Sequence, residues 1–238
     1  MGWGRTQHYT APTVKASDAR DTALGALRGS DCGPVVCGRV KANPGVELVD
    51  AGAAEYRAQG CDGLVAIGGG SSMDTAKGIG VVAVHDGSIL DYEWGNSPIH
   101  SRIPPLIAVP TTAGTGSEVT VWAVITDSNR KIKFNVGGTP NIASWVALHD
   151  PELSTGRPAP VTAGTGMDAL AHAVECYTMT YHQPFTDAVA LLSMEYFARY
   201  LRVAFSRGEN LLAYYHMSAA AMLGGLAYGT DSAAAGPP

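Results

Sequence analysis

The sequence predicts an α/β domain over residues 1–152, followed by an all-helical segment over residues 153–238. Three observations predict this division. Short apolar runs typical of buried strands alternate with helical patterns up to Asp150. Three long helical patterns without a strand pattern follow. Prolines interrupt the pattern between Pro151 and Pro160, which places the boundary there.

The elements can be placed in order along the chain. We expect strands at 34–37, 63–67, 106–109, 119–125, 131–136 and 145–148, where apolar or β-branched residues gather. Helical spacing predicts helices at 46–59, 72–84, 160–180, 184–206 and 208–229. The stretch 5–17 is polar and carries no strand pattern, so the first strand region is atypical.

Composition narrows the classes of protein. The 238 residues carry a net charge of -5, which leaves no basic surplus for a nucleic-acid backbone. The N-terminus lacks an apolar signal segment, and the apolar stretch 185–205 contains four charged residues, so we expect neither secretion nor a membrane span. Four cysteines without CxxC spacing do not suggest a disulfide framework or a zinc ribbon. A cytoplasmic protein is the expectation.

A glycine-rich turn, GGGSSMDTAK over residues 68–77, lies between a predicted strand and a predicted helix. The glycines allow a ligand to approach the backbone, and Ser71 and Ser72 can cap the helix or offer hydroxyls. A helix N-terminus in this position favours binding of an anion such as a pyrophosphate. Met73 stands where the usual dinucleotide fingerprint has its third glycine. The pattern alone is therefore also compatible with a plain tight turn.

Two further segments carry residues suited to binding a ligand or a metal ion. The loop PTTAGTGSE over residues 110–118 follows a predicted strand, where open α/β sheets bind ligands, although a solvated loop fits it equally well. Asp168 and His172 are four residues apart, so a helix would place them on one face where both could bind one divalent metal. Two ligands are too few for a complete site, and a capping aspartate with a core histidine explains an isolated pair better.

Taken together and in this order, the segments GGGSSMDTAKGIG, PTTAGTGSEVT and GMDALAHAVECY resemble the iron-containing (group III) alcohol dehydrogenase family from about Asn43 to Tyr228. The resemblance implies a Rossmann-like dinucleotide-binding domain followed by the first part of an all-helical metal-binding domain, with the active site between them. It implies hydride transfer between a small alcohol or aldehyde and NAD or NADP. It also implies Fe²⁺, with Zn²⁺ as the alternative because Asp and His ligands do not separate the two. Relatives are often dimers, so a homodimer is possible.

The resemblance also implies residue roles. Gly69, Gly70, Ser71 and Asp74 would hold the pyrophosphate and nearby cofactor groups, and Asp168 and His172 would be the first two metal ligands and the catalytic pair. The cofactor and nicotinamide side would be lined by Thr111, Thr112, Thr115, Ser117 and Lys133.

Family members complete the metal site with two histidines from further downstream, so the chain is expected to be truncated. His216 does not match a ligand position, and a helix-surface or core histidine is the expectation there. The alternative function is a non-catalytic remnant that retains weak nucleotide binding. A relative such as a glycerol dehydrogenase or dehydroquinate synthase is a third hypothesis, against which GMDALAHAVE argues.

Overall fold

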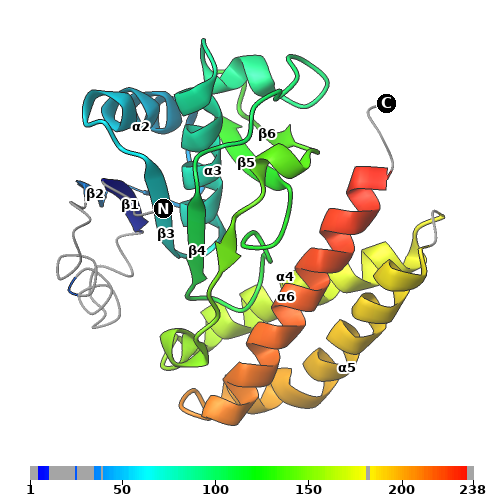
Figure 1. Cartoon of the computed structure of the whole chain (residues 1–238). Coiled ribbons are helices and arrows are strands. Elements are labelled where there is room, and N and C mark those ends of the chain that lie inside the picture. The colour runs from blue at the N-terminus through cyan, green and yellow to red at the C-terminus, as the bar shows by residue number, and fades with distance from the viewer. Residues whose placement is uncertain (1–4, 11–24, 26–34, 39, 181–182, 235–238) are drawn as a thin grey trace.

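A computed structural model of the chain describes residues 5–10, 25, 35–38, 40–180 and 183–234. It has an α/β layer and a helical layer, which lie side by side (Figure 1). No strand follows Ala147 in the described part of the chain. The predicted α/β fold class is therefore confirmed.

The main sheet of the described residues has five parallel strands in the order β2-β1-β3-β4-β7. Their bounds are β1 Thr6–Thr10, β2 Val35–Cys37, β3 Gly63–Gly68, β4 Leu106–Pro110 and β7 Val146–Ala147. All of β3 is buried, because Leu64 and Ala66 pack into the core on one face of the sheet while Val65 and Ile67 pack on the other. The predicted strands of this sheet from residue 34 onward are present within one or two residues of their predicted ends.

The expectation that residues 5–17 hold no strand is wrong for their beginning. β1 lies between β2 and β3, and Thr6, Gln7 and His8 are fully buried. Residues 11–17 lie outside the described residues. The Thr6 hydroxyl is 2.8 Å from His8 Nε2, and burial lowers the pKa of His8 to about 4, so the ring is neutral at pH 7. Backbone pairing on both sides holds a polar strand here, and a search for apolar periodicity does not detect such a strand.

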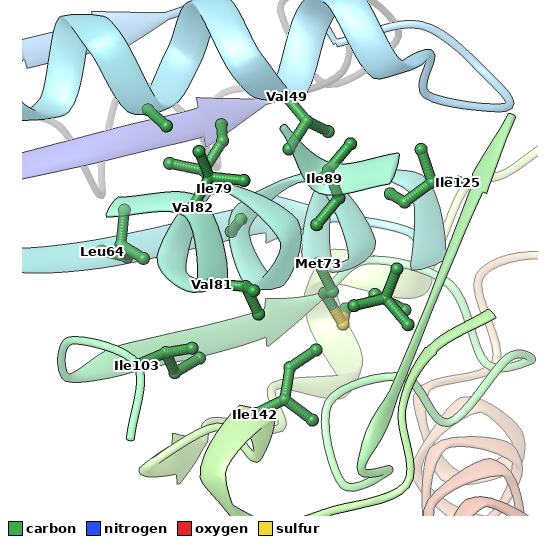
Figure 2. Close-up of a cluster of buried hydrophobic side chains, with 14 of the residues drawn as sticks. Val49, Leu64, Met73, Ile79, Val81, Val82, Ile89, Ile103, Ile125 and Ile142 are labelled. Carbon is green, nitrogen blue, oxygen red and sulfur yellow. The ribbon is translucent and has the colours of Figure 1, made fainter. Parts of the chain in front are cut away.

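Two helices, α2 (Val46–Ala58) and α3 (Gly70–Val84), cover one face of the sheet. Figure 2 shows α3 in the middle of the largest apolar cluster, with Val49 of α2 on one side and Ile142 on the other. Residues around the whole circumference of α3 are buried, including Lys77. A helix buried on all sides is held rigidly, which fixes the position of its first turn.

A separate antiparallel hairpin lies between β4 and β7 in the chain, with β5 Trp122–Asp127 and β6 Ile132–Gly137. β5 begins three residues later than the predicted 119–125, because Val119 N–H donates to the Gly116 carbonyl in a turn. The described part of this layer also contains the short 3-10 helices η1 Ile89–Tyr92, η2 Pro140–Ile142 and η3 Pro151–Ser154.

The helical layer consists of α4 Ala159–Thr178, α5 Pro184–Ser206 and α6 Leu211–Ala234. They pack on one another around Ala169, Phe197 and Met217. α6 begins later than the predicted residue 208, because Asn210 caps it: its Oδ1 accepts from the Ala213 N–H at 3.0 Å. Among the described residues, none of the helices combines the length and apolar character needed to span a bilayer.

Candidate functional site

A pocket of about 310 Å³ lies where the α/β layer faces α4 and α6. It brings together residues from three separate predicted segments and from the hairpin. The predicted site residues that line it are Gly70, Ser71, Asp74, Thr115, Ser117, Lys133, Asp168 and His172. Gly69, Thr111 and Thr112 are not among its lining residues.

The turn from β3 into α3 forms one end of the pocket. α3 begins at Gly70 with Gly69 as its N-cap and no side-chain cap, so the expectation that Ser71 or Ser72 caps it is wrong. A Cβ on Gly70 would lie 2.8 Å from Thr115, so only glycine lets the turn and the Thr115 loop approach this closely. The Ser72 N–H donates to the Gly69 carbonyl, whereas the N–H groups of Gly70 and Ser71 point into the uncapped end of the helix and are available to an anion in the pocket.

Asp74 is a half-buried hydrogen-bond acceptor one turn into α3, at the pocket wall. The Ser117 hydroxyl donates to Asp74 Oδ1 at 2.7 Å, and the Val124 N–H also donates to the carboxylate. Burial raises the pKa of Asp74 to about 6, against the opposing effects of the Lys77 charge and these hydrogen bonds. The carboxylate is therefore mainly ionised at pH 7.

Gly69, Thr111 and Thr112 are predicted cofactor residues that do not line the pocket. The Thr111 N–H donates to the Gly68 carbonyl, and its side chain is buried. Thr112 lines a separate small cavity together with Tyr214, and a Cβ on Gly69 would come 3.1 Å from the Thr112 hydroxyl. The chain turns tightly after β4, so only Thr115 and later residues of this loop reach the pocket.

The hairpin supplies a wall that the sequence analysis did not identify. Trp122, Val124 and Thr126 line the pocket from alternate positions of β5. Thr126 pairs with Lys133 across the hairpin, so both side chains lie on the same face. The period of two along a predicted strand could have identified these residues once Lys133 was assigned to the site. Other unpredicted lining residues are Asn43, Pro44, Thr120 and Tyr228.

Asp168 and His172 both reach the pocket from α4, with Asp168 exposed and His172 half-buried. The His172 ring stacks on Tyr228 of α6, with centroids 5.3 Å apart and planes at 28°. No group of three His, Cys, Asp or Glu residues suited to a metal ion occurs within the described residues. His216 stacks on Tyr200 at 4.0 Å within the helical layer and does not line this pocket.

Close contacts join the two layers beside the pocket. Gly116, at a φ of 63°, lies against Gly225 of α6, and a Cβ on Gly116 would come 2.5 Å from the Gly225 Cα. His149 lies between Glu118, 3.5 Å from its Nε2, and the Ser218 hydroxyl of α6, 2.9 Å from its Nδ1. The loop between Thr115 and Thr120 is therefore fixed from the helical side as well.

Comparison with known families matches both layers in sequence order. Residues 5–151 match the family described as iron-containing alcohol dehydrogenase. Residues 162–235 match the C-terminal part of the Fe-containing alcohol dehydrogenase family. The chain belongs to the iron-containing alcohol dehydrogenase family.

Individual members of this family cover nearly the whole chain. A choline dehydrogenase of Bacillus subtilis is 53% identical over 237 residues, which are 99% of this chain and 59% of that protein. The crystal structure of a 1,3-propanediol oxidoreductase has a TM-score of 0.91 at 38% identity and covers 96% of this chain and 59% of that one. The sulfoacetaldehyde reductase of Bifidobacterium kashiwanohense, solved with NAD⁺, has a TM-score of 0.85 at 33% identity over 94% of this chain and 58% of that one. The chain thus spans about 59% of the length of the family members it matches.

Proposed function

We propose that the pocket binds NAD or NADP and that the chain supplies the cofactor half of an oxidoreductase acting on small alcohols or aldehydes. The observation that carries this proposal is a single pocket that joins the α3 N-terminus with Asp168 and His172. Membership of an alcohol dehydrogenase family and the NAD⁺-bound structure of a relative support it.

Residues of the α/β layer have distinct tasks in this proposal. The uncapped first turn of α3 at Gly70 and Ser71 binds the pyrophosphate, and the exposed Lys133 adds a positive charge at the pocket wall. The Asp74 carboxylate, held by Ser117, accepts a hydrogen bond from a cofactor hydroxyl or amide. The nicotinamide ring, when bound, supplies the hydride acceptor or donor.

The metal site is incomplete within the described residues. We infer that Asp168 and His172 are two ligands of a divalent metal, Fe²⁺ or alternatively Zn²⁺, which would polarise the alcohol oxygen when bound. Catalytic sites commonly have three protein ligands, and no such cluster exists in the described part of the chain. Stacking on Tyr228 fixes the plane of the His172 ring, which orients it for a ligand in the pocket.

The substrate class follows from the relatives. The names of related proteins specify choline, 1,3-propanediol and sulfoacetaldehyde, all small and polar. We therefore propose a small, polar alcohol or aldehyde as the substrate class.

Titration of the purified chain with NADH and NADPH, followed by nicotinamide fluorescence, tests the proposal. Gly70→Ala should weaken nucleotide binding by about tenfold or more, because a Cβ there collides with Thr115 and moves the phosphate-binding turn. Gly164→Ala is the matched control, since nothing lies within 4 Å of a Cβ at that exposed helical glycine. Absence of nucleotide binding by the wild-type chain contradicts the proposal.

A second function is favoured by the two-ligand metal site: nucleotide binding without turnover. Addition of Fe²⁺ or Zn²⁺ and a small alcohol to the NAD⁺-bound chain separates the two functions. Formation of NADH supports the oxidoreductase. Tight NAD⁺ binding with no NADH formed supports a nucleotide-binding module.

A further inference from the structure

Lys77 is a buried cation that the proposed chemistry does not use. It projects from α3, one turn after Asp74, and its side chain has no exposed surface. Burying an ammonium is unfavourable unless hydrogen bonds and charges compensate for lost water. An unmatched lysine would not be stable in this position, so its partners indicate its task.

The partners of Lys77 all belong to one short segment. Its Nζ donates to the carbonyls of Ser117, Thr120 and Trp122 at 2.6, 2.7 and 2.9 Å. The Thr120 hydroxyl lies 3.2 Å away. Three carbonyl acceptors match the three protons of an ammonium, whereas a neutral amine has only two. The arrangement therefore holds the charged form, although burial lowers the pKa of Lys77 to about 8.

The same segment forms a wall of the pocket. Ser117, Thr120 and Trp122 all line it, and the Ser117 hydroxyl reaches Asp74. The three carbonyls all point toward the buried Lys77 Nζ. The orientation of their peptide units is therefore fixed, and so is the direction of the side chains between them. The carboxyl groups facing Lys77 are Asp74 on its own helix and Glu118 on the loop, and each favours the charged lysine when it is ionised.

We propose that Lys77 is a positioning residue of the nucleotide pocket, whose ammonium holds residues 117–122 in the one loop geometry that binds the cofactor. The effect of Lys77 on cofactor binding rests on the proposed nucleotide binding, whereas its hold on the loop does not. Lys77 itself touches no ligand, because three protein carbonyls take its donors.

Lys77→Met removes the donors while keeping an unbranched side chain of similar length. Hydrogen exchange of the ligand-free variant should become faster in peptides covering 115–124 and stay at the wild-type rate in α4–α6. The dissociation constant for NADH should rise by about tenfold, as expected if the competent loop is populated about one-tenth of the time. Saturating NADH should restore the lost protection over 115–124. A general loss of stability would instead speed exchange in α4–α6 as well. Lys131→Met, at an exposed hairpin lysine, is the control and should match wild type in both measurements.

Wild-type loop exchange together with wild-type NADH affinity in Lys77→Met overturns the inference. If that variant does not fold, Thr120→Val decides, since it removes one oxygen beside the ammonium at constant shape. Faster exchange over 115–124 without ligand then supports the inference, and unchanged exchange overturns it. If the wild-type chain binds no nucleotide, the proposed function fails, and the ligand-free exchange still shows whether Lys77 holds the loop.

Discussion

The pocket has a loop wall, formed by residues 70–77 and 115–124, and a helical wall, formed by Asp168, His172 and Tyr228. In the loop wall, Lys77 and Ser117 are buried, Asp74 is half-buried, and all three are hydrogen-bonded. In the helical wall, Asp168 is exposed and His172 is held through ring stacking. The side chains of Asp74, Lys77 and Ser117 are held by hydrogen bonds within the loop wall, whereas no hydrogen bond holds Asp168 in the described helical wall.

The difference extends to the helices behind each wall. α3 is buried around its circumference, but the helical layer leaves large apolar side chains in solvent, with Leu212 at 63%, Tyr215 at 56% and Phe185 at 54% exposure. A preorganised wall binds a ligand without first ordering its own side chains. Substitutions in the loop wall should therefore affect both stability and binding, and those in the helical wall mainly binding.

The largest effect is expected where the loop wall meets α6. Gly116→Ala places a Cβ 2.5 Å from the Gly225 Cα and also requires a φ of 63° from alanine. Overpacking and the left-handed backbone together should lower the unfolding free energy by roughly 4 kcal/mol. Chemical denaturation with a fitted midpoint and slope measures this change.

Gly164→Ala again provides the comparison, because it adds a methyl group at an open helical position and should be neutral or slightly stabilising. Equal denaturation midpoints for Gly116→Ala and wild type would show that the loop does not lie against α6.

Sequence reasoning located the loop wall more completely than the helical wall, for physical reasons. The glycine-rich turn and Asp168/His172 are local patterns, and the structure places both at the pocket. Tyr228 reaches the pocket only because α6 packs back onto α4, a contact between residues 56 positions apart that no local pattern encodes. β1 was missed because its polar residues are stabilised by backbone pairing with both neighbours. In the sequence, nothing distinguishes Lys77 from an ordinary helical lysine, and only the structure shows that it is buried.

A second test uses the buried carboxyl that joins the loop wall to His149. Burial raises the pKa of Glu118 to about 7 from its usual 4.5. Between pH 4.5 and about pH 7, the folded chain therefore keeps the Glu118 proton, whereas the unfolded chain loses it. The stability that this proton contributes is complete below pH 4.5 and is lost as the pH rises through about 7.

Glu118→Gln carries a neutral side chain at every pH. Relative to wild type, the variant should therefore gain roughly 3 kcal/mol of unfolding free energy between about pH 4.5 and pH 8. Denaturation of both proteins at several pH values measures the difference, in which other titrating groups largely cancel. Glu209→Gln, at an exposed position, controls for removal of a surface charge. A pH-independent difference for Glu118→Gln would contradict the buried environment.

The smallest stability effect is expected at the helical wall, where two aspartates can be compared directly. Asp168→Ala should change the unfolding free energy by only about 0.5 kcal/mol, because Asp168 is exposed on α4. Asp74→Ala removes an acceptor of the Ser117 hydroxyl and the Val124 N–H, and should lower the unfolding free energy by about 2 kcal/mol.

Calorimetric titration with Zn²⁺ should show the opposite order, with Asp168→Ala losing metal binding and Asp74→Ala retaining it. Equal destabilisation by the two substitutions would mean that Asp168 contributes as much to folding stability as Asp74. The Asp168 carboxylate would then have a structural role and would not be free to bind a metal ion.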